Sequence, residues 1–96
     1  MKKNELLKEL LSDLADITNQ VTNKEQAILK GKDKYLFIEF ASNYGGYRIV
    51  NVNIVNGGHS GAFGGNGCEG RVNYKTMEVK LRALIAGVNY INKPLN

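Results

Sequence analysis

Cysteine and histidine occur only once each in this chain of 96 residues, and both scarcities exclude classes of site. Because Cys68 is alone, no disulfide can form within the chain, which is typical of a cytoplasmic protein. One histidine and one cysteine cannot build a zinc centre, and as a catalytic pair His59 and Cys68 would stand in a glycine-rich stretch without a third group to orient them. We therefore expect no metal, no cofactor and no enzymatic activity.

Long apolar runs are also missing. No stretch approaches the roughly 20 apolar residues that a membrane span needs, and the N-terminal leucines alternate with charged residues instead of forming the apolar centre of a secretory signal. We therefore expect no membrane partner. The length suits one domain over residues 1–96, and 43% hydrophobic with 23% charged residues is ordinary globular usage. The net charge of +4 is a mild excess that leaves an anionic partner open.

Two amphipathic helices are predicted, one near each end of the chain. Over residues 4–21, leucine, isoleucine and valine recur at a spacing of three and four residues, and charged residues stand between them. Asn4 is the expected N-cap of this helix. Over residues 74–91 a continuous apolar face runs as far as Ile91, and Asn73 stands at the N-cap position.

Three strands are predicted between the helices, at residues 25–30, 35–42 and 47–55. The second and third alternate in polarity with a period of two, and turn residues around Gly31 and Gly45 separate the strands. The order α-β-β-β-α predicts an α+β fold. We expect a two-layer sandwich in which both helices cover one face of an antiparallel three-stranded meander.

One face of this predicted sheet is left without a cover. If the helices pack on the even-numbered apolar residues between Leu36 and Ile54, the opposite face is too apolar for plain exposure to water. We predict that this face is a protein interface, joined by one aromatic residue of the following loop. The predicted interface residues are Tyr35, Phe37, Tyr47, Ile49, Asn51 and Phe63.

A glycine-rich loop is predicted over residues 56–72, since seven of the 11 glycines fall between Gly57 and Gly70. Such a backbone can adopt positive φ angles at an entropic penalty. A bound ligand, a close-packed partner or simple flexibility of the loop has to offset this penalty. The stretch from Gly65 to Val72 matches the pattern G-x-G-x-x-G-x-V of dinucleotide-binding units. However, no strand leads directly into it and no acidic residue follows at the required distance, so we do not predict such a unit.

A set of basic residues offers an alternative site for nucleic acid or another anion. Lysines flank the turn at Gly31, and two further cations stand at the start of the final helix, next to glycine backbone amides. The residues of this basic set are Lys30, Lys32, Lys34, Gly67, Gly70, Arg71 and Lys75. The order of elements resembles that of double-stranded-RNA-binding domains, which contact the duplex with the first β–β loop and the start of the last helix. The resemblance implies the same use of these lysines here.

The C-terminal half carries a second resemblance. The stretches Tyr44–Arg48 and Gly70–Glu78, with the glycine-rich loop between them, resemble small proteins of phages and other mobile elements. This resemblance implies an origin of that kind and no particular activity.

Together these features favour a small non-enzymatic interaction module, which binds a protein partner or a second copy of itself through the uncovered sheet face and the glycine-rich loop. Nucleic-acid binding through the basic set is the alternative. Capture of a small phosphorylated ligand by the glycine-rich loop is a third hypothesis.

Overall fold

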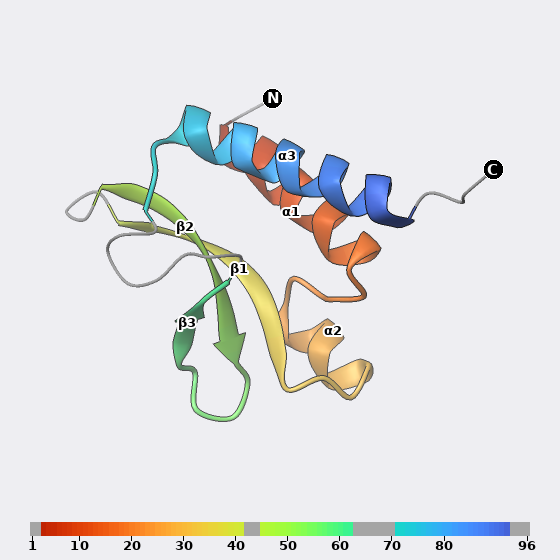
Figure 1. Cartoon of the computed structure of the whole chain (residues 1–96). Helices are drawn as coiled ribbons and strands as arrows, with labels where there is room; N and C mark the ends of the chain where they lie inside the picture. Colours follow the sequence, from red (N-terminus) through yellow and green to blue (C-terminus); the bar gives the residue numbers. More distant parts are fainter. Residues whose placement is uncertain (1–2, 42–44, 63–70, 93–96) are drawn as a thin grey trace.

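The computed structural model describes residues 3–41, 45–62 and 71–92. Within these ranges the elements follow in the order α1 (Lys3–Ile17), α2 (Lys24–Leu29), β1 (Lys34–Ala41), β2 (Gly46–Asn53), β3 (His59–Gly61) and α3 (Tyr74–Asn92). The helices α1 and α3 lie side by side over one face of the sheet, and α2 lies beside the start of β1 (Figure 1). The predicted α+β class, with two long helices on one face of an antiparallel sheet, is confirmed.

Helix α1 buries the predicted leucine stripe and ends earlier than predicted, at Ile17 instead of residue 21. Asn19 has a positive φ of 56°, and the N–H of Gln20 donates to the carbonyl of Ala15 at 2.8 Å. A residue in the left-handed conformation followed by such a backward bond is the Schellman way of ending a helix. The chain is therefore turned at Asn19, and Val21 leaves the helix to run beside the sheet.

Helix α2 occupies the place where the first strand was predicted, at residues 25–30, so that prediction is wrong. The side chain of Asn23 accepts a hydrogen bond from the N–H of Gln26 at 2.8 Å, which caps the first turn. At the other end Gly31 has a φ of 68°, and the N–H of Lys32 donates to the carbonyl of Ala27 at 2.8 Å. Both ends of this short helix are therefore set by local capping residues.

The three strands form an antiparallel meander in the order β1-β2-β3. The strands predicted at 35–42 and 47–55 correspond to β1 and β2, each displaced by one residue at its start. The third strand, β3, was missed because it lies inside the predicted glycine-rich loop, where a strand of three residues that ends in a glycine shows no alternation.

The register of β1 on β2 corrects the predicted grouping of side chains. Ala41 pairs with Gly46 and Ile38 with Ile49, so even-numbered residues of β1 stand opposite odd-numbered residues of β2. The sequence prediction had grouped even with even. Because side chains alternate with a period of two, a register that differs by one residue moves a whole strand's side chains to the other face.

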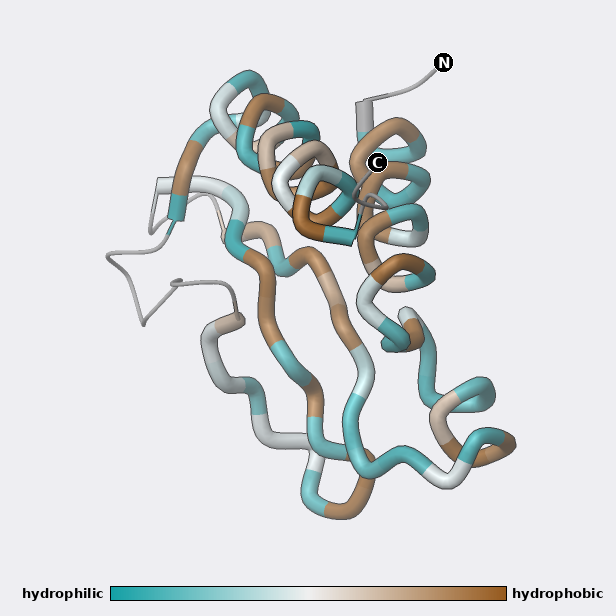
Figure 2. Tube along the Cα trace, turned by 45° about the vertical axis from the view of Figure 1, so that its right-hand side comes forward, coloured by the Kyte–Doolittle hydropathy of each residue, from teal (hydrophilic) through white to brown (hydrophobic). Residues whose placement is uncertain are grey.

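The core lies between α1, α3 and one face of the sheet. Its largest fully buried side chains include Leu7 and Leu14 of α1, Leu36 and Ile49 of the sheet, and Leu81 of α3. Figure 2 shows the apolar segments of both helices turned toward each other and toward the sheet. We call the sheet face that looks away from α1 and α3 the open face.

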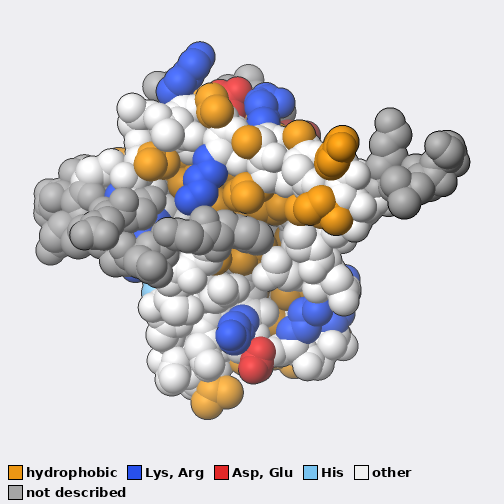
Figure 3. Space-filling model, viewed as in Figure 1, with side chains coloured by type: hydrophobic (Ala, Val, Ile, Leu, Met, Phe, Trp, Pro, Cys, Tyr) orange, Lys and Arg blue, Asp and Glu red, His pale blue; other side chains and the backbone are white. Residues whose placement is uncertain are grey.

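Helix α3 begins as predicted. The side chain of Asn73 accepts a hydrogen bond from the N–H of Thr76 at 2.8 Å, which confirms this residue as the N-cap. The predicted apolar face is buried at Met77 and Leu81, half-buried at Val88 and exposed at Ile91. Figure 3 shows hydrophobic side chains gathered over α3 toward its C-terminal end. The second half of the helix therefore extends past the core.

The segment that leads into α3 continues the edge strand that β3 begins. The N–H of Ala62 donates to the carbonyl of Ile49, and two residues further along β2, Tyr47 exchanges two hydrogen bonds of 2.7 Å with Val72. Ala62 and Arg71 therefore occupy neighbouring positions along β2, with Arg71 opposite Arg48.

Candidate functional site

The predicted interface residues do not share one face. Ile49 is fully buried in the core, and Tyr47 and Asn51 are half-buried on the same, helix-covered side of the sheet. Tyr35 and Phe37 lie on the open face, and Phe63 lies outside the described residues. The predicted grouping is wrong because it assumed the other register.

A cluster of charged side chains centred on Glu39 lies on the open face of the sheet. The Oε1 atom of Glu39 accepts hydrogen bonds from Arg48 Nε at 3.0 Å and from the guanidinium of Arg71. On the other side of the carboxylate, His59 Nδ1 lies 2.5 Å from Oε2. We call these four residues the Glu39 cluster. It ties β1, β2 and β3 to the segment that precedes α3.

The charges of this cluster perturb the titration of its carboxylate. The pKa of Glu39 is lowered to about 2, chiefly by the hydrogen bond with His59 and then by those with Arg48 and Arg71, against an opposing effect of burial. Hydrogen bonds to the charged form stabilise a carboxylate as an anion. Glu39 is therefore ionised throughout the neutral range and is fully engaged in binding its neighbours.

The contact between Glu39 and His59 crosses the sheet from β1 to β3 above Val50. The register places Val50 opposite Phe37 on one side and Gly61 on the other, between the two partners of the contact. Val50 is fully buried, although it lies on the face without helices. Part of the open face is therefore covered although no helix lies over it. The apolar surface predicted for this face is reduced accordingly, and Ile49, which was counted in it, lies in the core.

Arg71 is the most buried cation of the cluster, with a side chain that is 8% exposed. One of its terminal nitrogens donates to the carbonyl of Gly46 at 3.1 Å and the other binds Glu39. Its Nε has no partner among the described residues. Arg71 was predicted to bind an external anion, but in this structure its guanidinium is held by the protein's own carboxylate and carbonyl.

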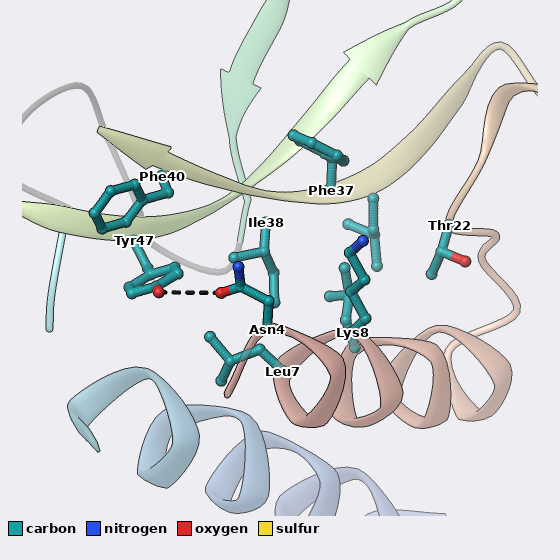
Figure 4. A pocket seen from close by; sticks show the side chains of 10 residues that line it. Asn4, Leu7, Lys8, Thr22, Phe37, Ile38, Phe40 and Tyr47 are labelled. Carbon is teal, nitrogen blue, oxygen red and sulfur yellow. Dashed lines mark hydrogen bonds between the residues drawn. The ribbon is translucent and has the colours of Figure 1, made fainter. Parts of the chain in front are cut away.

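A groove runs between α1 and the β1 edge of the sheet, with a volume of about 390 Å³ (Figure 4). From the helical side it is lined by Asn4, Leu7, Lys8 and Leu11, and Thr22 closes one end. The sheet contributes Leu36, Phe37, Ile38, Phe40 and Tyr47. The lining is mainly apolar, and Lys8 is its only charged side chain among the described residues. Such a mixture is typical of binding sites.

Aromatic side chains build one end of this groove. The rings of Phe40 and Tyr47 pack with their centroids 4.7 Å apart, and the Tyr47 hydroxyl donates to Asn4 Oδ1 at 3.2 Å (Figure 4). Asn4 was predicted to cap α1, but the helix begins at Lys3, and its side chain accepts this bond instead. Phe40 and Phe37 remain 58% and 42% exposed. Two large aromatic surfaces therefore border the groove.

The basic set predicted for nucleic acid is divided between the two ends of the β1–β2 hairpin. Lys34 pairs with Asn53 at one end, whereas Arg71 contacts Gly46 at the other. At about 3.3 Å per residue, a strand of eight residues separates these ends by roughly 25 Å. At the first end Lys32 donates to the carbonyl of Asn19 at 2.7 Å, at the C-terminal end of α1. Gly67 and Gly70 lie outside the described residues.

Sequence reasoning missed Glu39, Arg48 and His59 as a functional group. A signal was present, because Glu39 and Arg48 are charged residues within two otherwise mostly uncharged strands. With the correct register they stand directly opposite each other, as cross-strand ion pairs do. The position of His59 could not be found in this way, since β3 carries no periodic pattern.

The remaining classes of site find no support in the structure. Among residues 3–41, 45–62 and 71–92, no three potential metal ligands lie close enough to hold an ion. The helices of this described part are also too short or too polar to cross a bilayer. No protein family, curated protein or solved structure matches the chain.

Proposed function

We propose that this protein is a small non-enzymatic interaction module that binds a protein partner in the groove between α1 and β1. The observation that carries the proposal is the combination of an apolar groove with two exposed aromatic rings at its border, Phe37 and Phe40. Aromatic residues are enriched in the energetically dominant parts of protein interfaces. The proposal keeps Phe37 and Tyr47 from the predicted interface and moves the binding surface from a sheet face to this groove.

Nucleic-acid binding is less well supported. The two halves of the basic set lie at opposite ends of a strand pair, and Arg71 and Lys32 are already bound within the protein. Capture of a phosphorylated ligand would depend on residues outside the described ranges. The groove therefore remains the leading candidate.

The experiment that tests this function is selection of binders from a displayed library of random peptides, followed by affinity measurements on two variants. Phe40→Glu places a charge at the groove, and Val79→Glu places one on the exposed surface of α3. The two side chains are similarly exposed, at 58% and 60%, so the pair is matched. We expect Phe40→Glu alone to weaken binding by about tenfold or more, as for a dominant interface residue.

A library without binders, for a protein that also does not self-associate, would contradict the proposal, and so would binders that tolerate Phe40→Glu. If the partner is a second copy of the chain, sedimentation velocity would show an association that Phe40→Glu abolishes and Val79→Glu preserves.

A further inference from the structure

The outer edge of β1 has unpaired backbone groups next to the groove. β2 directs its odd-numbered backbone groups toward β3, as the bond from Ala62 to the carbonyl of Ile49 shows. In an antiparallel ladder the even-numbered residues of β2 then direct their backbone groups toward β1, where their partners are odd-numbered. The backbone N–H and C=O groups of the even-numbered residues Ile38 and Phe40 therefore point away from β2. Leu36, in the same series, donates outward to the carbonyl of Val21 at 2.8 Å.

This single bond shows that the β1 edge accepts a neighbouring extended chain. Among the described residues this is the only backbone hydrogen bond on the outer side of β1, and α2 begins three residues after Val21. In the part of the chain that the structure describes, no backbone group pairs with Ile38 or Phe40 on the outer side. Each of these residues offers one donor and one acceptor there.

The groove begins where this free edge lies. The side chains of Ile38 and Phe40 are on the helix-covered side, and Phe37 on the open side also lines the groove, so the hollow wraps around the strand edge (Figure 4). An added strand would send alternate side chains to the two sides. Those on the helix side would meet Leu7 and Leu11 of α1.

We propose that the groove binds an extended segment of a partner protein, which adds to the β1 edge as a fourth strand. Apolar side chains of that segment pack between α1 and Ile38, and an acidic side chain pairs with Lys8, the charged residue of the lining. Such strand addition takes affinity from main-chain hydrogen bonds and specificity from alternate side chains. The inference rests on the proposed function and specifies the conformation and chemistry of the partner.

A second copy of this chain fits the edge less well. Antiparallel pairing of two β1 edges through both free residues puts Ile38 opposite Phe40 of the other copy. This register sets the two Glu39 clusters opposite each other. Each cluster holds one carboxylate and two guanidinium groups, so two groups of the same net positive charge would approach each other, which is destabilising. An acidic segment from another protein avoids this repulsion and complements Lys8.

The first test uses the selected peptides and two variants of one residue. Phe40→Pro removes the outward N–H, and Phe40→Ala removes the same ring but keeps that N–H. Proline is tolerated at an outward-facing position of an edge strand, so the β1–β2 ladder is retained. Relative to Phe40→Ala, we expect Phe40→Pro to weaken peptide binding about tenfold, the effect of leaving a hydrogen-bonding group unsatisfied.

The second test does not depend on the folding of a variant. Hydrogen exchange of the wild-type protein should show slower exchange of the Ile38 and Phe40 amides when a selected peptide is bound.

A third test concerns the charge of Lys8. Lys8→Glu should weaken the binding of an acidic peptide, whereas Lys24→Glu, on α2 away from the groove, should leave this binding unchanged. Replacing the acidic residue of the peptide by asparagine should remove this difference.

The outcomes separate the two proposals. In one outcome, peptides bind the groove with equal affinity in the proline and alanine variants and do not protect these amides. This result would overturn strand addition and would still support the interaction function. Self-association that protects the same amides would also overturn it, in favour of a second copy. A library without any binder, together with a protein that does not self-associate, would contradict both proposals.

Discussion

The carboxylate of Glu39 binds two guanidinium groups and an imidazole. Its lowered pKa, about 2 against an ordinary 4.5, means that the folded state favours the ionised form. The unfolded chain binds a proton as pH falls through about 4.5, whereas the folded chain does so only near 2. The stabilisation by Glu39 is therefore fully present above about pH 4.5 and is lost as pH falls from there toward 2.

We predict that Glu39→Gln lowers the free energy of unfolding at neutral pH by about 1–2 kcal/mol, because it leaves buried arginine groups without their anion. Urea unfolding at a series of pH values measures this, and the variant should lose less stability than the wild type between about pH 4.5 and 2. Glu78→Gln is the control, since the partner of Glu78 is the exposed Arg82 on the same helix, α3. Equal pH profiles for wild type and Glu39→Gln would contradict the prediction.

Gly46 is required by a close approach of two backbones. It has a φ of 117°, and an added Cβ would lie 2.5 Å from the carbonyl oxygen of Val72, which is bonded to Tyr47. Gly45 has a φ of 94° but no atom within 4 Å of such a Cβ. Both alanine variants carry backbone strain, and only Gly46→Ala adds the collision. Thermal unfolding should show Gly46→Ala to be less stable than Gly45→Ala by more than about 1 kcal/mol; similar losses would contradict the structure at this bridge.

On the scale of one element, α3 divides into a half that builds the core and a half that does not. Leu81 is fully buried between α1 and the sheet, whereas Ile91 is 79% exposed. We predict that Leu81→Ala lowers the free energy of unfolding by about 2–4 kcal/mol, as large-to-small changes in a core do. Ile91→Ala should change it by less than about 0.5 kcal/mol. Chemical denaturation of both variants tests this, and a large loss for Ile91→Ala would show that the end of α3 is covered in solution.

At the scale of the whole molecule, Ala62 and Arg71 have eight residues between them in the chain and yet lie opposite neighbouring residues of β2. Since Ala62 and Arg71 occupy these positions along β2, deletion of residues 63–70 should leave the fold, the bridge from Tyr47 to Val72 and the Glu39 cluster intact. We predict an unchanged or increased free energy of unfolding, by up to about 2 kcal/mol, because closing a loop has an entropic cost. Thermal unfolding and the amide resonances of β2 provide the measurement.

Deletion of residues 63–69 is the matched control. It leaves one extra residue between Ala62 and Arg71, which displaces the arginine from its position opposite Arg48 and should lower stability. Equal stability of the two deletion variants would show that this register is not what holds the segment before α3. The longer deletion also tests whether peptide binding in the groove needs the glycine-rich loop.

Local patterns were sufficient to predict the class of the fold and much of its secondary structure. The spacing of leucines in α1 and the N-cap Asn73 of α3 act over three or four residues, so they can be read without knowing what packs where. The alternation in β1 and β2 is equally local. Helix α2 was mistaken for a strand although its cap, Asn23, and its terminating Gly31 were both present in the sequence.

The candidate site could not be predicted in the same way, because its parts meet only through long-range pairing. The register of β1 on β2 decided that Ile49 is in the core and that Glu39 faces Arg48, and alternation within each strand is compatible with either register. The turn at Asn19 and the unpaired edge at Ile38 decided that a groove exists beside α1. Periodicity is a property of neighbours along the chain, whereas a binding surface is a property of neighbours in space, and only the packed structure relates the two.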